Sequence, residues 1–311
     1  MSISDVIVKG SIDGDGYLSC SLGDSTPILT LRAKGKRPKS EKELYALGIT
    51  LEAFKQSILL KGGAPNIQIE HLMATGKEIP VIYMYKSNPT DLPLVLFVHG
   101  YTVDKISSIR AGVLLAQAGF FTVLVDARLH GERKPANFEA KFEKEFAKTF
   151  LQVFRGTAQD LSALIDYFND DPRIDTERTG ISGISMGGFT TFLAATHDPR
   201  IKAAAPLIGS PDFHMIHSYP NSPPVDEKTI AELTKYSPLN NYEKFKNTAL
   251  LVQNGAKDKM VPPAGSRSLD KLLTKAGNTP RAYRYIEYPD AIHEVPDKML
   301  HQSVTWFKKY L

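Results

Sequence analysis

Residues 183–188 read Gly-Ile-Ser-Met-Gly-Gly, and this stretch decides how the chain folds. It fits the pattern Gly-x-Ser-x-Gly, a sharp turn from a strand into a helix that exposes a serine hydroxyl. Because so short a pattern recurs by chance, its context is the test. Residues 178–184 predict a buried strand before the turn, and residues 188–195 predict the start of a helix after it. We therefore interpret Ser185 as a nucleophile, whereas the neighbouring Ser182 lacks the closing glycine.

Strands and helices alternate on both sides of this turn. Apolar runs predict strands at residues 67–72, 81–85, 94–98, 120–125, 178–184, 201–208, 248–252 and 282–288. Helical patterns occupy residues 109–118, 158–168, 269–276 and 295–311. We expect the first two strands to pair antiparallel. The alternation that follows predicts the α/β class, with a mostly parallel twisted sheet and helices on both faces.

The first 65 residues differ from the rest and form an N-terminal extension to a main domain at residues 66–311. Turn dipeptides such as Asp13-Gly14 and Gly23-Asp24 predict short strands and turns. Ser40 and Thr50 are typical helix caps, so we expect two helices after them. The second helix has an apolar face that can pack on the main domain or on a second copy of the chain. The sequence favours neither, so a homo-oligomer formed through the extension stays open.

Two insertions interrupt the alternation. The first carries phenylalanines four residues apart, which predicts a helix with an aromatic stripe; these are Phe138, Phe142, Phe146, Phe150 and Phe154. Core packing is the favoured interpretation of such a stripe, and a wall of a substrate pocket is the alternative. The second insertion, residues 213–236, lies between two predicted strands and is a candidate cap or lid. The alternative for it is an ordinary surface excursion.

Composition excludes several classes of protein. The chain has 311 residues, a net charge of +4 and 23% charged residues, without the clustered basic face of a nucleic-acid-binding protein. Cys20 is the sole cysteine, which excludes an internal disulfide framework and a cysteine metal cluster. No apolar run approaches the ~20 residues that a membrane span requires. The N-terminus lacks the pattern of a signal peptide. We expect a soluble, cytoplasmic protein.

A serine nucleophile needs a histidine base and an acid that orients the histidine. After a strand-to-helix turn of this kind, the acid and then the histidine follow the serine along the chain. Asp258 follows the strand that ends near residue 252, and His293 follows the last strand. Loops after parallel strands meet at one edge of a sheet. A turn-forming aspartate and a residue at a helix start are the structural alternatives, but the combination with Ser185 predicts a catalytic triad.

Two other carboxylates compete with Asp258 for the role of the acid. Asp212 follows the strand after the nucleophile, where some hydrolases place their acid. Asp126 ends the strand at residues 120–125 and begins a segment that resembles a structural turn, with Arg128 available to a carboxylate. We favour Asp258 over both.

The negative oxygen of a tetrahedral intermediate needs preorganised N–H donors, each contributing ~3 kcal/mol in the transition state. We expect the backbone N–H groups of Met186 and Tyr101 to supply them. We expect His99 to brace the loop that carries Tyr101 rather than to act as a base. His214 and His217 could share a helix face but lack a third ligand, so we expect no catalytic metal and no cofactor.

The combined motifs resemble the α/β-hydrolase superfamily over residues 66–311. They are, in order, His99-Gly100-Tyr101, Asp126-x-Arg128-x-His130-Gly131, Gly183-x-Ser185-x-Gly187, Asp258-x-x-Val261-Pro262 and His293. Within the superfamily they are most similar to the dienelactone-hydrolase and prolyl-oligopeptidase-like esterase branch. Acetyl-xylan esterases share some of these motifs but differ at Leu129 and Met186. Peptidases of the prolyl family usually carry a large propeller domain, which 65 residues cannot form.

The resemblance implies a serine carboxylic-ester hydrolase acting on esters with small to medium acyl groups. A thioesterase, an amidase or peptidase, and a perhydrolase are alternatives that would use the same triad. A non-catalytic binding protein of the same fold is a further alternative, because a fold does not fix a function. A nucleotide-binding protein is disfavoured, since no Gly-x-Gly-x-x-Gly follows the first parallel strand.

Overall fold

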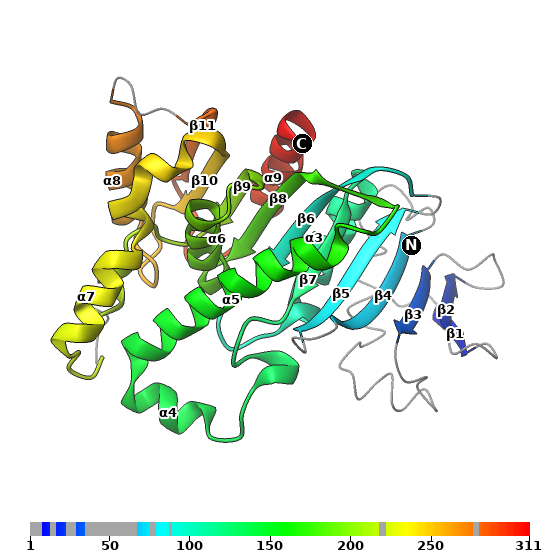
Figure 1. Cartoon of the computed structure of the whole chain (residues 1–311), viewed down its shortest axis with the longest axis horizontal. Coiled ribbons are helices and arrows are strands. Elements are labelled where there is room, and N and C mark those ends of the chain that lie inside the picture. Colours follow the sequence, from blue (N-terminus) through cyan, green and yellow to red (C-terminus); the bar gives the residue numbers. More distant parts are fainter. Residues whose placement is uncertain are drawn as a thin grey trace.

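The chain is described by a computed structural model at residues 8–12, 17–22, 29–34, 67–74, 79–86, 89–217, 222–275 and 280–311. These residues form an 11-stranded sheet in the order β1-β2-β3-β4-β5-β7-β6-β8-β9-β10-β11 (Figure 1). The strands are β1 (Val8–Ile12), β2 (Tyr17–Leu22), β3 (Leu29–Lys34), β4 (Ile67–Ala74), β5 (Ile79–Lys86), β6 (Leu92–Val98), β7 (Phe121–Val125), β8 (Ile174–Ile184), β9 (Ile201–Leu207), β10 (Ala249–Gly255) and β11 (Ala282–Tyr288).

Helices connect most of these strands. The α-helices are α3 (Ile109–Gln117), α4 (Phe138–Lys144), α5 (Phe146–Phe168), α6 (Met186–His197), α7 (Glu227–Tyr236), α8 (Ala264–Leu273) and α9 (Asp297–Tyr310). Short 3₁₀ segments are η2 (Lys105–Ser108), η3 (Gly131–Arg133), η4 (Phe213–Ile216) and η5 (Pro238–Asn247). No helix in the described segments combines the length and apolarity needed to cross a bilayer.

The sheet is mostly parallel, as the alternation of strands and helices predicts. β4 pairs antiparallel with β5, and β5 with β7. From β7 through β6, β8, β9 and β10 to β11, every neighbouring pair is parallel. The carboxyl ends of these parallel strands therefore share one edge, and the loops that follow them gather there.

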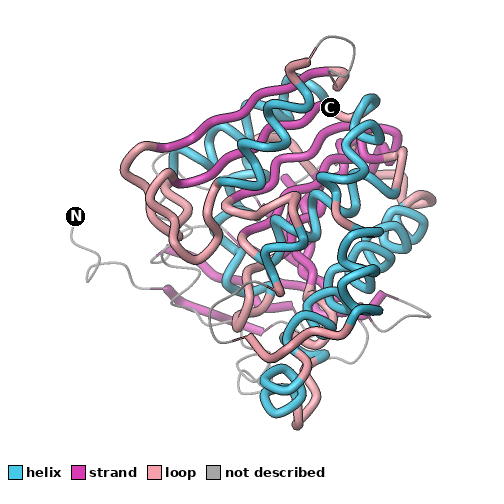
Figure 2. The backbone as a smooth tube through the Cα atoms, turned by 90° about the vertical axis from the view of Figure 1, so that its left-hand side faces the viewer, coloured by secondary structure: helices cyan, strands magenta, loops and turns pink. Residues whose placement is uncertain are grey.

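The central part of the sheet, from β5 to β10, is buried on both faces because apolar side chains point to both sides of its strands. In β6, Leu94, Leu96 and Val98 enter the core on one face, and Val95 and Phe97 enter the core on the other. Helices α5, α6 and α8 contribute to the first core, and α3 and α9 to the second. Figure 2 shows the helices on both sides of the strands. The expected α/β architecture is confirmed.

The described part of the N-terminal extension continues the same sheet. β1 pairs antiparallel with β2, β2 antiparallel with β3, and β3 parallel with β4. The turn dipeptides Asp13-Gly14 and Gly23-Asp24 lie outside the described residues. The helices expected after Ser40 and Thr50 lie outside the described residues. The division into an extension and a main domain near residue 65 stays a prediction.

The first insertion forms two helices instead of one. The chain breaks at Glu145, whose φ of −128° and ψ of 45° are not helical, so α4 ends before it and α5 begins after it. α5 then runs for 23 residues to Phe168 and carries both the end of the aromatic stripe and the helix expected at residues 158–168.

Whether the second insertion is a cap stays a prediction. It contains η4 and α7, and α7 is held against α5 by side chains. The Arg155 guanidinium lies 3.9 Å from the ring centroid of Tyr236 and 3.7 Å from a carboxylate oxygen of Glu232. A cation over an aromatic ring contributes ~0.5–1 kcal/mol at such partly exposed sites.

Candidate active site

Ser185 occupies the sharp turn between β8 and α6. Its φ of 53° and ψ of −110° lie in a backbone region that non-glycine residues rarely adopt, at a cost of about 1–3 kcal/mol. Two backbone hydrogen bonds hold it there: its N–H donates to the carbonyl of Leu207, and its carbonyl accepts the N–H of Phe189. The strain is therefore maintained by the strand on one side and the helix on the other.

Gly187 allows the turn to approach the end of β6. A Cβ at this position would lie 2.1 Å from the carbonyl oxygen of Val98, closer than any side chain can be. This close approach brings the loop after β6 beside the serine. A Cβ built on Gly100 would lie 4.0 Å from the Cβ of Ser185.

Ser185, His293 and Asp258 form one hydrogen-bonded chain. His293 Nε2 lies 3.0 Å from Ser185 Oγ, and His293 Nδ1 lies 2.7 Å from Asp258 Oδ2. Asp258 Oδ1 also accepts the backbone N–H groups of Met260 and Val261, both at 2.9 Å. Since a carboxylate can only accept, Nδ1 carries the proton and Nε2 is free to accept the serine proton.

The competing residues have other partners. Ser182 is fully buried and its hydroxyl donates to the carbonyl of Ala205 at 2.6 Å. Asp126 forms an ion pair with Lys105. Asp212 accepts a backbone N–H two residues further along and caps η4. Their partners leave Asp258 as the carboxylate that contacts the histidine.

An apolar pocket of about 120 Å³ opens at Ser185. Its lining includes Phe146, Phe150 and Phe154 from α5, and Met215 and Ile216 from η4. The aromatic stripe therefore has both of the roles that the sequence allows. It lines a pocket, and three of its members, Phe138, Phe142 and Phe154, are buried in the core.

Several lining residues escaped the sequence analysis. Phe189 and Met260 line the pocket. A signal was present for both: Phe189 lies one helical turn after Ser185, and Met260 lies two residues after Asp258. Met215 and Ile216 fall inside the insertion considered as a cap, but nothing local distinguishes them within it.

A sequence model of the prolyl oligopeptidase family matches residues 109–311. The chain belongs to this family. The proposed esterase YitV of Bacillus subtilis is 33% identical over 260 residues, which cover 79% of the chain and 100% of YitV. The esterase YjfP of Escherichia coli is 25% identical over 245 residues, which cover 75% of the chain and 96% of YjfP.

A solved structure of a proposed dienelactone hydrolase from Klebsiella pneumoniae shares the fold, with a TM-score of 0.58 and 21% identity over 78% of the chain and 98% of that structure. These matches confirm the resemblance to the α/β-hydrolase superfamily and to its dienelactone-hydrolase and prolyl-oligopeptidase-like branch. As a member of the prolyl oligopeptidase family with esterase-named relatives, the protein is a serine hydrolase that acts on esters or peptides.

In this family member the two residues expected to bind the oxyanion border the serine pocket. Met186 is the first residue of α6, where a backbone N–H has no acceptor within the helix. Tyr101 follows Gly100 in the loop after β6. Both Tyr101 and Met186 line the pocket that contains Ser185.

His99 braces the loop that carries Tyr101. Its Nδ1 donates to the carbonyl of Gly100 at 2.7 Å, and its Nε2 accepts the N–H of Ala127 at 3.1 Å. The ring is fully buried, and desolvation by burial lowers the pKa of His99 to about 4. His99 is therefore neutral at physiological pH, which its role as an acceptor for Ala127 requires.

The other histidines whose side chains the structure describes gather no ligand set. The rings of His214 and His217 are 6.0 Å apart, and His214 Nε2 lies 3.1 Å from the hydroxyl of Thr234. Within the described segments, no group of three histidine, cysteine, aspartate or glutamate side chains is arranged to hold a metal ion.

Proposed function

We propose that this serine hydrolase cleaves carboxylic esters, with Ser185 as nucleophile, His293 as general base and acid, and Asp258 as the orienting carboxylate. The hydrogen-bonded chain from Ser185 through His293 to Asp258 carries the proposal. The nearly full-length match to two esterase-named relatives supports esters over peptides as substrates.

The first half of the reaction transfers the acyl group to the enzyme. The Ser185 hydroxyl gives its proton to His293 Nε2 while its oxygen attacks the ester carbonyl. The carbonyl oxygen becomes negative and accepts the backbone N–H groups of Tyr101 and Met186. The bond to the alcohol then breaks, and the alcohol takes the proton from His293.

The second half releases the acid. A water molecule gives a proton to His293 as it attacks the acyl carbon, and the oxyanion forms again in the same place. When the bond to Ser185 Oγ breaks, His293 returns the proton to the serine. Asp258 stays ionised throughout and stabilises the imidazolium that forms in each half.

The pocket beside Ser185 favours short, uncharged acyl groups. Its walls are aromatic and aliphatic, so a charged acyl group would lose its hydration without a partner. Each CH₂ that it buries contributes at most ~0.8 kcal/mol, which corresponds to about fourfold in kcat/KM. We expect kcat/KM to rise from p-nitrophenyl acetate to butyrate and to fall for octanoate, which exceeds the cavity.

The central test compares Ser185→Ala with Ser182→Ala on the best of these esters. We expect Ser185→Ala to lower kcat by at least about 10³-fold and to abolish labelling by a fluorophosphonate, with unchanged thermal unfolding. Ser182→Ala removes a buried hydroxyl from β8, the strand that precedes the turn, and should retain labelling and kcat. Near-normal activity in Ser185→Ala would disprove the assignment.

The same assay separates the chemical alternatives. Hydrolysis of an acyl-CoA would report thioesterase activity of the same triad, and hydrolysis of a peptide anilide would report peptidase activity. Turnover that depends on peroxide would report perhydrolase activity. A kcat/KM for any of these above that for the p-nitrophenyl esters would replace the ester as the substrate. Absence of fluorophosphonate labelling in the wild type would instead favour a non-catalytic binding protein.

A further inference from the structure

Two loops at the carboxyl edge of the sheet are bound tightly together. One follows β6, spans residues 99–108 and carries Tyr101. The other follows β7 and spans residues 126–133. β6 and β7 are parallel neighbours, so both loops leave the sheet side by side. At their junction lies Asp126, whose side chain is fully buried.

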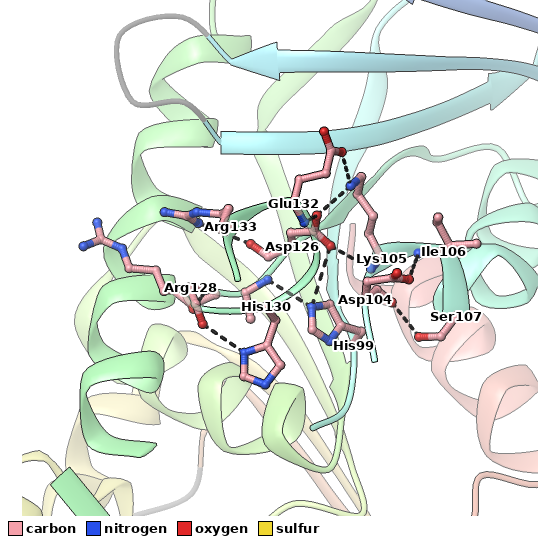
Figure 3. Close-up of polar contacts among 12 residues, drawn as sticks. His99, Asp104, Lys105, Ile106, Ser107, Asp126, Arg128, His130, Glu132 and Arg133 are labelled. Carbon is pink, nitrogen blue, oxygen red and sulfur yellow. Dashed lines mark hydrogen bonds and ion pairs between the residues drawn. The ribbon is translucent and has the colours of Figure 1, made fainter. Parts of the chain in front are cut away.

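The Asp126 carboxylate accepts three donors, two of which come from Lys105 on the other loop (Figure 3). Oδ1 accepts the backbone N–H of Lys105 at 2.9 Å, and Oδ2 accepts its ammonium at 2.6 Å. Oδ2 also accepts the backbone N–H of Glu132 at 3.0 Å. The Lys105 ammonium donates in turn to the Glu132 carboxylate at 2.5 Å, while the Lys105 side chain is only 2% exposed.

A second junction lies at the start of the loops, where His99 accepts the N–H of Ala127 at 3.1 Å (Figure 3). The loop after β6 is thus fixed on both sides of Tyr101, at residue 99 and at residue 105. The Tyr101 ring also contacts the ring of His130, with centroids 5.7 Å apart. The hydrogen-bond partners of residues 99 and 105, Ala127 and Asp126, both belong to the loop after β7.

Gly131 permits the loop after β7 to close over the carboxylate. Its φ is +55°, and a Cβ there would lie 2.3 Å from the carboxylate atoms of Asp126. A larger residue at this position would therefore have to displace the Asp126 side chain.

The cost of burying these charges argues that the ion pair does more than stabilise the fold. Desolvation costs several kcal/mol of folding free energy per ion. Replacing a buried ion pair by well-packed uncharged side chains therefore often leaves stability unchanged or raises it. What the pair supplies here is geometry, because both carboxylate oxygens accept donors of Lys105 on the loop after β6 and Oδ2 also accepts the Glu132 N–H on the loop after β7. The fixed segment is the one that presents the Tyr101 N–H.

We propose that Lys105 and Asp126 are positioning residues for ester hydrolysis, whose buried ion pair holds the loop after β6 so that the Tyr101 N–H meets the oxyanion. This inference rests on the proposed function. Misplacement of a group in an active site by 1 Å can cost about 10²-fold in rate, so a loop freed from Asp126 should weaken the transition state more than the bound substrate.

The test uses two variants and one matched control in the full chain. Lys105→Met removes the cation and leaves Asp126 buried without its counter-charge. The double variant Lys105→Met/Asp126→Asn removes both charges and keeps an amide oxygen for a backbone N–H. The control is Arg200→Met, which removes the cation paired with the buried Asp198 at the end of α6 remote from Ser185.

The measurements are thermal unfolding, kcat and KM on p-nitrophenyl butyrate, and inhibition by a phenylboronic acid, which forms a tetrahedral adduct with the serine. In the folded double variant we expect kcat to fall about 10-fold or more and KM to change less than about threefold. Boronate affinity should weaken in proportion to kcat/KM. Arg200→Met should lower the unfolding temperature and keep wild-type kcat and boronate affinity.

A kcat within about twofold of wild type in the folded double variant would overturn the proposal. So would a rise in KM as large as the loss in kcat/KM, because that pattern reports ground-state binding. Loss of folding in both variants would assign the pair to stability and overturn it as well. Absence of esterase activity in the wild-type protein would contradict the proposed function itself. The fluorophosphonate labelling and the Ser185→Ala variant test that function separately.

Discussion

Asp258 determines which nitrogen of His293 carries the proton. Its carboxylate accepts from Nδ1, so Nε2 presents a lone pair to the serine. In Asp258→Asn the amide can offer its own N–H to Nδ1 and favour the wrong tautomer. We expect kcat to fall by about 10³–10⁴-fold with KM little changed, measured at neutral pH on p-nitrophenyl butyrate.

Asp212→Asn is the matched control for this substitution. Asp212 is the competing acid from the sequence, and as an asparagine it can still cap η4. We expect its kcat to remain near that of the wild type. An equal loss of kcat in both variants would contradict the assignment of the acid to Asp258.

The candidate catalytic residues could be predicted from the sequence, but the residues that position the loop after β6 could not. Asp258 and His293 could be located because each follows a predicted strand, and parallel strands end at a common edge. The bond between Lys105 and Asp126 could not be found in this way. It joins positions 21 residues apart, through the adjacency of β6 and β7, and Asp126 alone resembles any aspartate in a turn.

At the scale of elements, α5 sets the shape of the acyl pocket. Phe150 is a partly buried member of its aromatic stripe and lines the cavity beside Ser185. In Phe150→Ala the cavity extends along α5, so longer acyl chains should fit. We expect the ratio of kcat/KM for octanoate over butyrate to rise by about tenfold, since two or more additional CH₂ groups can be buried.

Phe168→Ala is the control on the same helix. Phe168 is 2% exposed at the opposite end of α5 and belongs to the core. Its truncation should cost about 3–5 kcal/mol of unfolding free energy and leave the acyl preference unchanged. If Phe168→Ala shifted the preference as much as Phe150→Ala, the effect would come from a loosened fold and the pocket assignment would be wrong.

The aromatic stripe illustrates why elements are easier to predict than their surroundings. A spacing of four residues indicates a helical apolar face, but it does not say which element covers that face. Here part of the face packs in the core and part stays open beside Ser185. The break at Glu145 is also invisible in the spacing, because the phenylalanines keep their period across it.

At the scale of the whole molecule, the order of strands brings the site together. Ser185, Asp258 and His293 come from loops after β8, β10 and β11, with only β9 between the first two strands. The same order places β7 beside β6, so the loop after β7 braces the loop after β6. No local pattern in the sequence indicates that β3 pairs in parallel with β4. Which two strands pair is decided by tertiary contacts.

Buried neutral histidines make the stability of the whole molecule depend on pH. Desolvation lowers the pKa of His99 to about 4, and it also lowers the pKa of the buried His130. The nearby His130 ring lowers the pKa of His99 further, whereas the carboxylates of Asp126 and Asp104 raise it. In the unfolded chain these imidazoles should titrate near their ordinary pKa of about 6.5.

Between pH 6.5 and about 4 the unfolded chain therefore binds more protons than the folded one, so the unfolding free energy falls as the solution is acidified through this window. His99 alone accounts for at most about 3 kcal/mol of that fall. His99→Gln keeps an oxygen that can accept the Ala127 N–H but does not titrate. We expect this variant to be less stable than the wild type at pH 7 and to lose less stability on acidification. Unfolding temperatures measured from pH 7 to pH 4 test this, and parallel curves for the two proteins would show that His99 is not the buried neutral group inferred from its hydrogen bonds.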